Sequence, residues 1–201
     1  MTDERWTLII PVKGSDGAKS RLDHPLRHEL ARAMAIDTVA TALATPAVER
    51  VVIVTPRDSA TPFAALGAHV VSDPGFGLAA AIRAGLSEVG QDHHRAVLLG
   101  DLPALQPRIL AAGLRHAART PRGFVRDAAG VGTTLLTARA GERHDPAFGG
   151  ASALAHLRRG YRELPIARGS GLRADIDTVA DLSALAPSTL GIRTRQALSR
   201  L

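Results

Sequence analysis

The segment that decides the fold is Leu8–Leu22, which reads LIIPVKGSDGAKSRL. An apolar run breaks at a loop with two glycines, and the loop leads through basic residues toward a helix. The chain has 25 lysines and arginines, of which only Lys13 and Lys19 are lysines, and both stand in this segment. Lysine carries a compact point charge rather than a planar fork. Beside a glycine-containing strand-to-helix turn, that charge indicates a phosphate site, the alternative being chance placement.

Outward from this segment, short apolar runs alternate with helical patterns. Strands are predicted at 6–12, 51–54, 69–72 and 96–99, and helices at 25–43, 63–66, 78–89 and 107–119. This alternation predicts an α/β fold with a mainly parallel sheet. Segments 124–126 and 131–137 predict an inserted β-hairpin, followed by a helix at 152–159, a strand at 162–166 and a last helix around 181–182. We expect one domain over 1–201, with a C-terminal tail from about 188.

Composition argues against several classes of protein. The net charge of +6 comes from scattered arginines, and aromatic residues make up only 3%, so the sequence lacks the charge blocks and stacking rings of a nucleic-acid-binding protein. The chain has no cysteine, which excludes disulfides and thiolate metal sites. No apolar run has the length of a membrane span, and no signal region precedes Trp6. We therefore expect a cytoplasmic protein without a membrane partner.

Three aspartates are candidates for a metal site. Asp101 ends an apolar strand, and Asp175 and Asp177 are two residues apart, so an extended backbone places both carboxylates on one side. Oxygen ligands of this kind suit Mg²⁺, with substrate phosphates completing the shell. The alternatives are a strand-end turn at Asp101 and a helix cap at Asp177 or Thr178.

Ligands of open α/β sheets bind outside the carboxyl ends of the strands, where the opening loop, Gly75–Gly77 and Asp101 are all expected. The opening loop matches neither a P-loop nor a dinucleotide fingerprint. We expect its amides and both lysines to hold a triphosphate. Thr133 and Ser152 each follow a glycine-rich stretch, either as anion-binding residues or as a hairpin threonine and an N-cap serine.

Taken together, these segments resemble the guanylyltransferases of deazaflavin coenzyme (F-420) biosynthesis, which act on 2-phospho-L-lactate or phosphoenolpyruvate. The resemblance is carried by Pro11–Lys13, Ala18–Leu22, Gly100–Leu105, Gly130–Thr133, Phe148–Ser152 with His156, and Asp175–Thr178 with Asp181–Leu182. It spans nearly the whole chain. The resemblance implies a three-layer nucleotidyltransferase fold of the glycosyltransferase-A type.

The resemblance also implies a set of roles. Lys13, Lys19 and Asp101 would be catalytic; Asp101, Asp175 and Asp177 would hold Mg²⁺; Pro11, Val12, Lys13, Lys19, Arg21, Gly77 and Leu78 would contact GTP; and Thr133, Gly149 and Ser152 would contact the phosphorylated acid. A homodimer stays among the alternatives. The chain departs from the family at Ala79, where asparagine is usual, and at Gly150, in a loop where proline is common.

The arginine-rich composition is typical of a GC-rich bacterium, for which the resemblance favours phosphoenolpyruvate. Three alternatives stay open from the residues alone. One is a related transferase acting on a sugar phosphate or molybdopterin. The others are a basic nucleotide- or nucleic-acid-binding protein without catalysis and, less favoured, a P-loop ATPase.

Overall fold

The computed structural model describes residues 4–13 and 27–200. The described strands are β1 (Trp6–Pro11), β2 (Val48–Thr55), β3 (His69–Ser72), β4 (His94–Leu98), β5 (Arg122–Arg126), β6 (Thr133–Ala138) and β7 (Arg162–Glu163). The described helices are α1 (Arg27–Leu43), α2 (Thr61–Ala65), α3 (Leu78–Ser87), α4 (Pro107–Ala117), α5 (Ser152–Arg158), α6 (Val179–Ser183) and α7 (Ile192–Leu198), with 3₁₀ turns η2 (Arg57–Ser59) and η3 (Pro187–Thr189). Within this part of the chain, no helix has the length and apolar character that crossing a membrane requires.

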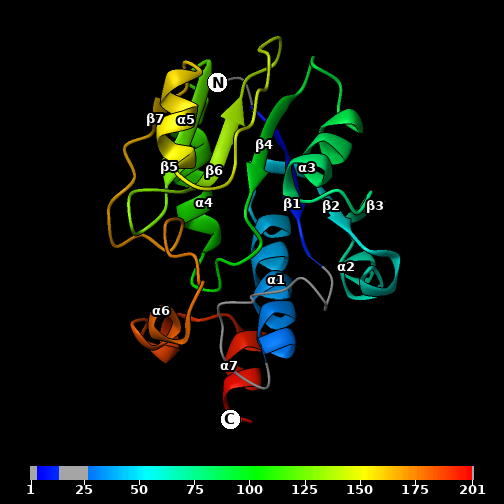
Figure 1. Ribbon diagram of the computed structural model, residues 1–201, viewed down its shortest axis with the longest axis vertical. Coiled ribbons are helices and arrows are strands. Elements are labelled where there is room, and N and C mark those ends of the chain that lie inside the picture. The colour runs from blue at the N-terminus through cyan, green and yellow to red at the C-terminus, as the bar shows by residue number, and fades with distance from the viewer. Residues whose placement is uncertain (1–3, 14–26, 201) are drawn as a thin grey trace.

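The strands form one seven-stranded sheet in the order β3-β2-β1-β4-β6-β5-β7 (Figure 1). β1 pairs in parallel with β2 and β4, and β2 pairs in parallel with β3. β6 is antiparallel to both of its neighbours, β4 and β5, while β7 is parallel to β5. Because only β6 runs in the opposite direction, its first residue lies at the edge where the other strands end. The mixed α/β fold with a mainly parallel sheet and a β5–β6 hairpin is thus confirmed.

Helices cover both faces of the sheet and bury two separate cores. Alternate residues of β1 point to opposite faces of the sheet. Leu8 and Ile10 lie on the face covered by α1 and α4, whereas Ile9 lies on the face covered by α3. On this second face, Phe124 of β5 and Ala153 of α5 complete the core. All five side chains are fully buried. The result is the three-layer arrangement that the family resemblance implies.

A third apolar cluster joins the end of the chain to α1. Met34 of α1 packs with Ile176, Leu182 of α6 and Leu190, all of them buried. Figure 1 shows α6 and α7 below the sheet, beside the lower half of α1, with the two termini at opposite ends of the long axis. The C-terminal tail from about residue 188 therefore contains a packed helix, although the helical periodicity of its sequence is weak.

Most described element boundaries lie within two residues of the predicted ones, but β2 begins three residues before the predicted 51–54 and β7 ends three residues early. β3 has the predicted bounds, whereas β7 covers only Arg162–Glu163 instead of 162–166. Leu164 still donates its N–H to the Phe124 carbonyl at 2.8 Å, but Ile166, the next residue whose N–H would face β5, donates to the Leu164 carbonyl at 2.8 Å instead. This tight local turn ends the pairing with β5.

We predict that Asp37→Ala detaches α7 from α1. Asp37 is buried, and its carboxylate accepts hydrogen bonds from the backbone N–H of Arg193 (3.1 Å) and Thr194 (2.8 Å) and from the Thr194 hydroxyl (2.7 Å). Losing these partners leaves buried donors unsatisfied and costs about 1–3 kcal/mol. The free energy of unfolding from urea titration measures the loss. Asp58→Ala, on the exposed turn η2, is the matched control and is expected to change it little; equal effects would contradict the prediction.

Candidate active site

The site begins where β1 and β4 end side by side. Gly100 follows β4, and a Cβ built on it would lie 3.3 Å from the Val12 side chain, so the two chain segments touch at this point. Val12 itself donates its N–H to the Val54 carbonyl at 2.8 Å, which fixes the end of β1. The next residues along each segment are Lys13 and Asp101. The structure thus places Lys13, at the start of the opening loop, and Asp101 at one edge of the sheet, as predicted, whereas residues 14–26 of that loop lie outside the described residues.

The loop after Asp101 is held on α1. The Thr38 hydroxyl accepts the Leu102 N–H at 3.1 Å and donates to the Met34 carbonyl at 2.9 Å. Farther along, the Gly191 N–H donates to the Pro103 carbonyl at 2.8 Å. The loop is therefore clamped between α1 and the segment that leads into α7.

The segment 171–177 crosses the same edge and is fixed there by its backbone. The Thr134 hydroxyl of β6 donates to the Leu172 carbonyl at 2.6 Å, and the Ile176 N–H donates to the Asp101 carbonyl at 3.2 Å. Gly171 lies so close to Ala104 that a Cβ built on it would collide with the Ala104 carbonyl. These contacts place Asp175 and Asp177 beside Asp101, although the sequence separates them by more than 70 residues.

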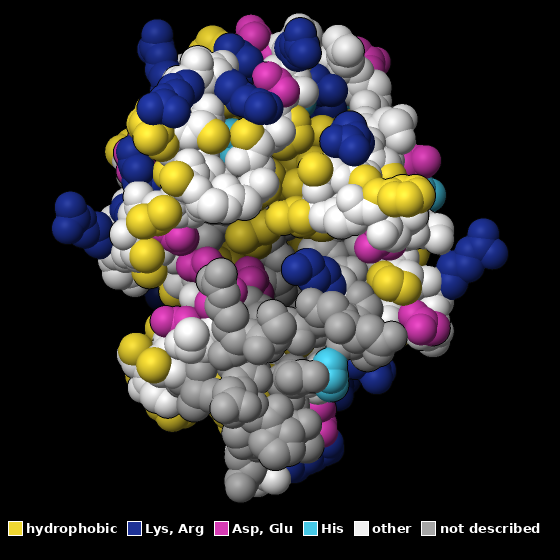
Figure 2. All heavy atoms as spheres, in the orientation of Figure 1, with side chains coloured by type: hydrophobic (Ala, Val, Ile, Leu, Met, Phe, Trp, Pro, Cys, Tyr) yellow, Lys and Arg dark blue, Asp and Glu magenta, His cyan; other side chains and the backbone are white. Residues whose placement is uncertain are grey.

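The carboxylates at this edge repel one another. Burial raises the pKa of Asp175 to about 7, together with repulsion from Asp101, Asp127 and Asp177. Asp175 is thus surrounded by three other acidic side chains. Figure 2 shows acidic side chains gathered beside a hollow in this face of the molecule. A cation bound here would relieve the repulsion, because opposite charge favours the ionised carboxylate.

The side chains at this edge supply only part of the ligands that a hard divalent cation needs. Among residues 4–13 and 27–200, no three His, Cys, Asp or Glu side chains are grouped so that they could hold a metal ion by themselves. Mg²⁺, however, is usually held by one or two carboxylates and takes its other ligands from water and substrate phosphates. The arrangement therefore fits an ion that binds together with a phosphorylated substrate.

The helix-cap alternative for this segment applies to Thr178 rather than to Asp177. The Thr178 hydroxyl accepts the Asp181 N–H at 3.2 Å, while Asp181 Oδ2 accepts the Thr178 N–H at 2.7 Å, which is a capping box at the start of α6. Asp177 is exposed and precedes the cap. Its carboxylate is thus not the side chain that caps α6.

The start of β6 brings Thr133 to the same edge. Asp127 turns the β5–β6 hairpin by accepting the N–H groups of Val131 (2.9 Å) and Gly132 (2.6 Å). Arg173 holds this turn through its guanidinium, which donates to the Asp127 carbonyl at 3.1 and 3.3 Å. The sequence indicates the hairpin turn that contains Asp127, but it does not reveal the role of Arg173, because Arg173 binds a backbone carbonyl 46 residues away and leaves no motif.

The predicted acceptor residues lie around one buried histidine. Thr133 Oγ1 is 2.9 Å from His156 Nδ1, and the Ala147 N–H donates to His156 Nε2 at 2.9 Å. Gly149 and Gly150, which follow in the same loop, have φ angles of 112° and 45°. Proline cannot adopt a positive φ, so the backbone at Gly150 could not accommodate the proline that is common in this loop of the family. Ser152 is buried at the first residue of α5.

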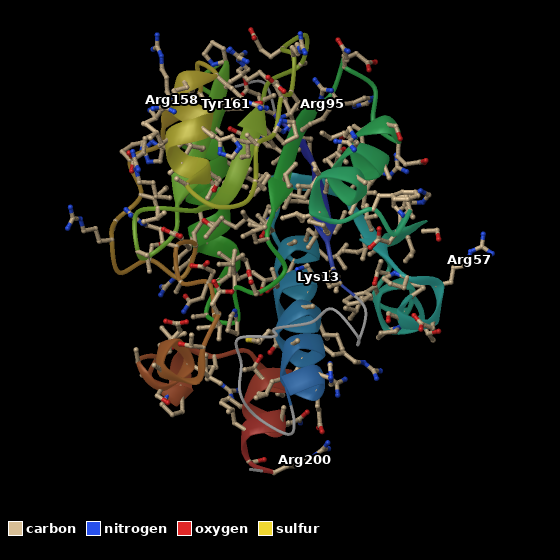
Figure 3. All side chains as sticks on the ribbon, in the orientation of Figure 1. Lys13, Arg57, Arg95, Arg158, Tyr161 and Arg200 are labelled. Atoms are coloured by element: carbon tan, nitrogen blue, oxygen red, sulfur yellow. The ribbon has the colours of Figure 1, made fainter. Side chains whose placement is uncertain are left out.

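The residues predicted to contact a nucleotide lie partly within the described chain. Pro11 ends β1, Val12 is half-buried, and Lys13 is exposed at the middle of the molecule (Figure 3). Gly77 has a φ of 82° and precedes Leu78, the first residue of α3. Lys19 and Arg21 lie outside the described residues. The spatial relation of the two lysines therefore stays a prediction.

A cavity of about 1100 Å³ borders this lysine. It lies between α1, α2 and α7, and its lining includes Lys13, Arg32, Asp58 and Arg193. Asp101, Asp175 and Asp177 are not part of its lining. Lys13 thus borders both this cavity and the sheet edge that carries the aspartates.

We predict that Gly171→Ala destabilises the protein, because the new Cβ would collide with backbone that cannot rotate away. Overpacking of this kind costs about 1–3 kcal/mol, and each kcal/mol lowers the melting temperature of a chain this long by about 2–4 °C. Thermal unfolding monitored by circular dichroism measures the shift. Gly169→Ala is the matched control, since a Cβ there meets nothing within 4 Å. A melting temperature equal in both variants would refute the prediction.

Comparison with known proteins agrees with this geometry. Residues 26–175 match the family described as the MobA-like NTP transferase domain. A phosphoenolpyruvate guanylyltransferase of Streptomyces coelicolor is 46% identical over 98% of this chain and 97% of its own. One of Streptomyces scabiei is 44% identical over the same shares of both chains.

Among solved structures, a putative nucleotide-diphospho-sugar transferase from Desulfovibrio desulfuricans G20 superposes with a TM-score of 0.68 at 16% identity, covering 100% of this chain and 95% of its own. This likeness concerns the fold alone. The chain belongs to the phosphoenolpyruvate guanylyltransferase family of nucleotidyltransferases, within the MobA-like NTP transferase group.

Proposed function

We propose that this protein transfers a guanylyl group from GTP to the phosphate of phosphoenolpyruvate, releasing pyrophosphate, as a step in the biosynthesis of coenzyme F-420. The observation that carries the proposal is the meeting of Asp101 and Asp175 at the edge of the sheet, next to the end of β1. It occurs in a chain 46% identical to a protein of that name over nearly its full length. The acceptor alternative is 2-phospho-L-lactate.

The reaction needs no general base. A phosphate oxygen of the acceptor attacks the α-phosphorus of GTP, a new P–O bond forms, and the bond to the β-phosphate breaks with its electron pair leaving on pyrophosphate. The second pKa of a phosphate monoester is about 6, so the attacking oxygen is already anionic near neutral pH. His156, the histidine closest to the acceptor residues, has its pKa lowered to about 4 by burial and by Arg159, against the opposing charge of Asp145. It therefore stays neutral near pH 7, and the proposed step offers it no proton to accept, because the attacking oxygen is already ionised.

The difficulty lies in bringing two polyanions together. Two like charges about 4 Å apart repel by about 1 kcal/mol in water and several times more near a protein surface. In our proposal Lys13, Lys19 and Arg21 would contact the triphosphate, and Asp101, Asp175 and Asp177 would hold Mg²⁺ together with substrate phosphates and water. When bound, Mg²⁺ would neutralise phosphate charge and stabilise the leaving pyrophosphate.

The acceptor end of the site uses small polar groups. We assign Thr133, Gly149 and Ser152 to the phosphorylated acid, in line with their positions around His156. Backbone N–H groups near Gly149 can approach an anion closely because the residue has no Cβ. The acceptor would thus lie at the start of β6 and α5, across the aspartates from Lys13.

The direct test is a product assay with purified protein. GTP is incubated with phosphoenolpyruvate and, separately, with 2-phospho-L-lactate, a sugar phosphate or molybdopterin, and the products are identified by mass spectrometry. ATP and CTP replace GTP in parallel reactions. A guanylylated enolpyruvate diphosphate, formed in preference to the other products, supports the proposal. Preferred transfer to a sugar phosphate or molybdopterin would replace it with the related transferase activity.

We predict that Asp101→Asn reduces Mg²⁺-dependent pyrophosphate release by at least about a hundredfold, because several kcal/mol of charge stabilisation by the cation is lost. Asp175→Asn is expected to do the same. Pyrophosphate release is followed in a coupled assay, and circular dichroism verifies that the fold is retained. Asp92→Asn is the control, because its side chain is exposed at the far end of the sheet, next to the start of β4. Full activity of Asp101→Asn would remove the metal assignment.

We also predict that Lys13→Arg and Lys19→Arg each lose most of the activity although the charge is unchanged. The guanidinium is larger and planar, and it cannot replace a compact ammonium between phosphates. The KM for GTP and kcat are measured for both variants. Arg57→Lys is the reverse control, since Arg57 points into solvent beyond α2 (Figure 3). Near-normal rates in both lysine variants would contradict the point-charge argument.

A further inference from the structure

We propose that His156 is a positioning residue that turns the Thr133 hydroxyl into a dedicated hydrogen-bond donor for the anionic acceptor. The inference rests on the proposed function, because it concerns the acceptor end of that site. Sequence analysis singled out His156 as part of the family resemblance, and the proposed reaction leaves it without a chemical role. The contacts of its two ring nitrogens supply one.

The first step is the tautomer of the imidazole. Nε2 lies 2.9 Å from the backbone nitrogen of Ala147, and a backbone N–H can only donate. Nε2 must therefore accept, and the proton of the neutral ring sits on Nδ1. Burial lowers the pKa of His156, which keeps the ring in this neutral form.

The second step is the direction of the next hydrogen bond. Nδ1 lies 2.9 Å from Thr133 Oγ1. Because Nδ1 carries the proton, it donates, and the threonine oxygen accepts. Within the described residues, Thr133 Oγ1 has no other hydrogen-bond partner. The hydroxyl hydrogen is thus available for a further acceptor, and an anionic phosphate or carboxylate offers acceptors only.

The third step is the rigidity of the ring. His156 is fully buried, and its ring contacts Phe148 at 5.2 Å and Tyr161 at 5.5 Å between centroids, both edge-on. Rotating the ring by 180° would exchange nitrogen for carbon at both polar contacts and lose both hydrogen bonds. The packing therefore holds the ring in the one orientation that serves Thr133 and Ala147 together.

The same ring joins two parts of the acceptor site. Thr133 begins β6, whereas Ala147 precedes the loop that contains Gly149 and Gly150. Through one donated and one accepted hydrogen bond, His156 sets the position of both. A substrate group that offers only donors would meet a donor at Thr133, so the arrangement selects for anions at this point.

Two amide variants separate the two contacts. His156→Asn places an amide N–H near the Nδ1 position and keeps the donation to Thr133, while His156→Gln reaches the Nε2 position and keeps only the contact with Ala147. We expect His156→Gln and Thr133→Val each to raise the KM for phosphoenolpyruvate about tenfold with the KM for GTP unchanged, which corresponds to about 1.4 kcal/mol. His156→Asn is expected to stay within about threefold of the wild type. The double variant Thr133→Val/His156→Gln should be no worse than the poorer single variant, because both remove one interaction.

The tautomer is measured separately by ¹⁵N NMR of protein labelled at histidine, with His156→Asn used to assign the signal. A directly bonded proton on Nδ1 and none on Nε2 is expected, whereas a proton on Nε2 would overturn the inference. Equal increases of both KM values in His156→Gln, with a lower melting temperature, would overturn it in favour of a purely structural role. His116→Gln in α4 is the control and is expected to change neither KM. An Nδ1-protonated ring in a protein that guanylylates neither acid would instead refute the proposed function alone.

Discussion

The structure depends on holding carboxylates together against their own repulsion. Asp175 is placed among Asp101, Asp127 and Asp177, and the cost of this placement is visible in its pKa, which burial and these neighbours raise to about 7. Hydrogen bonds to backbone carbonyls supply the opposing force, from the Ile176 N–H to the Asp101 carbonyl and from the Thr134 hydroxyl to the Leu172 carbonyl. Such bonds do not depend on the charge of the side chains. The acidic cluster is therefore held by hydrogen bonds whose donors and acceptors are not the carboxylates themselves.

The reversed direction of β6 gives the site its second half. In a fully parallel sheet, the strand between β4 and β5 would end at the edge where β6 begins, and that edge would carry a loop leading into a helix. Because β6 is antiparallel, its first residues, Thr133 and Thr134, meet the ends of β4 and β5 directly. Thr134 then holds the segment that carries Asp175, while Thr133 contacts His156. One strand thus connects the acidic cluster with the acceptor residues.

Much of the frame could be predicted from the sequence, because its signals are local. The strand His69–Ser72 stands between a Gly-Ala step and an Asp-Pro pair, and its predicted bounds match those observed. Asp101 was placed at the sheet edge because it directly follows an apolar run. The role of Arg173 could not be predicted, since it binds the backbone carbonyl of Asp127, 46 residues away, and any residue has such a carbonyl. The docking of α7 on Asp37 spans 157 residues and gives no periodic pattern.

The two ends of the site solve the same problem with different chemistry. At the proposed nucleotide end, lysine charge would face a triphosphate whose charge changes as pyrophosphate leaves, and a flexible ammonium can follow that change. At the acceptor end, the attacking oxygen must keep its charge and its lone pair until the new bond forms. A nearby full positive charge would stabilise that oxygen in the ground state and lower its reactivity, whereas in our proposal the neutral hydroxyl of Thr133, directed by a neutral His156, would orient the acceptor without neutralising it. The low pKa of His156 is therefore suited to its place, because a protonated imidazolium would put on the acceptor side the charge that the reaction needs beside the leaving group.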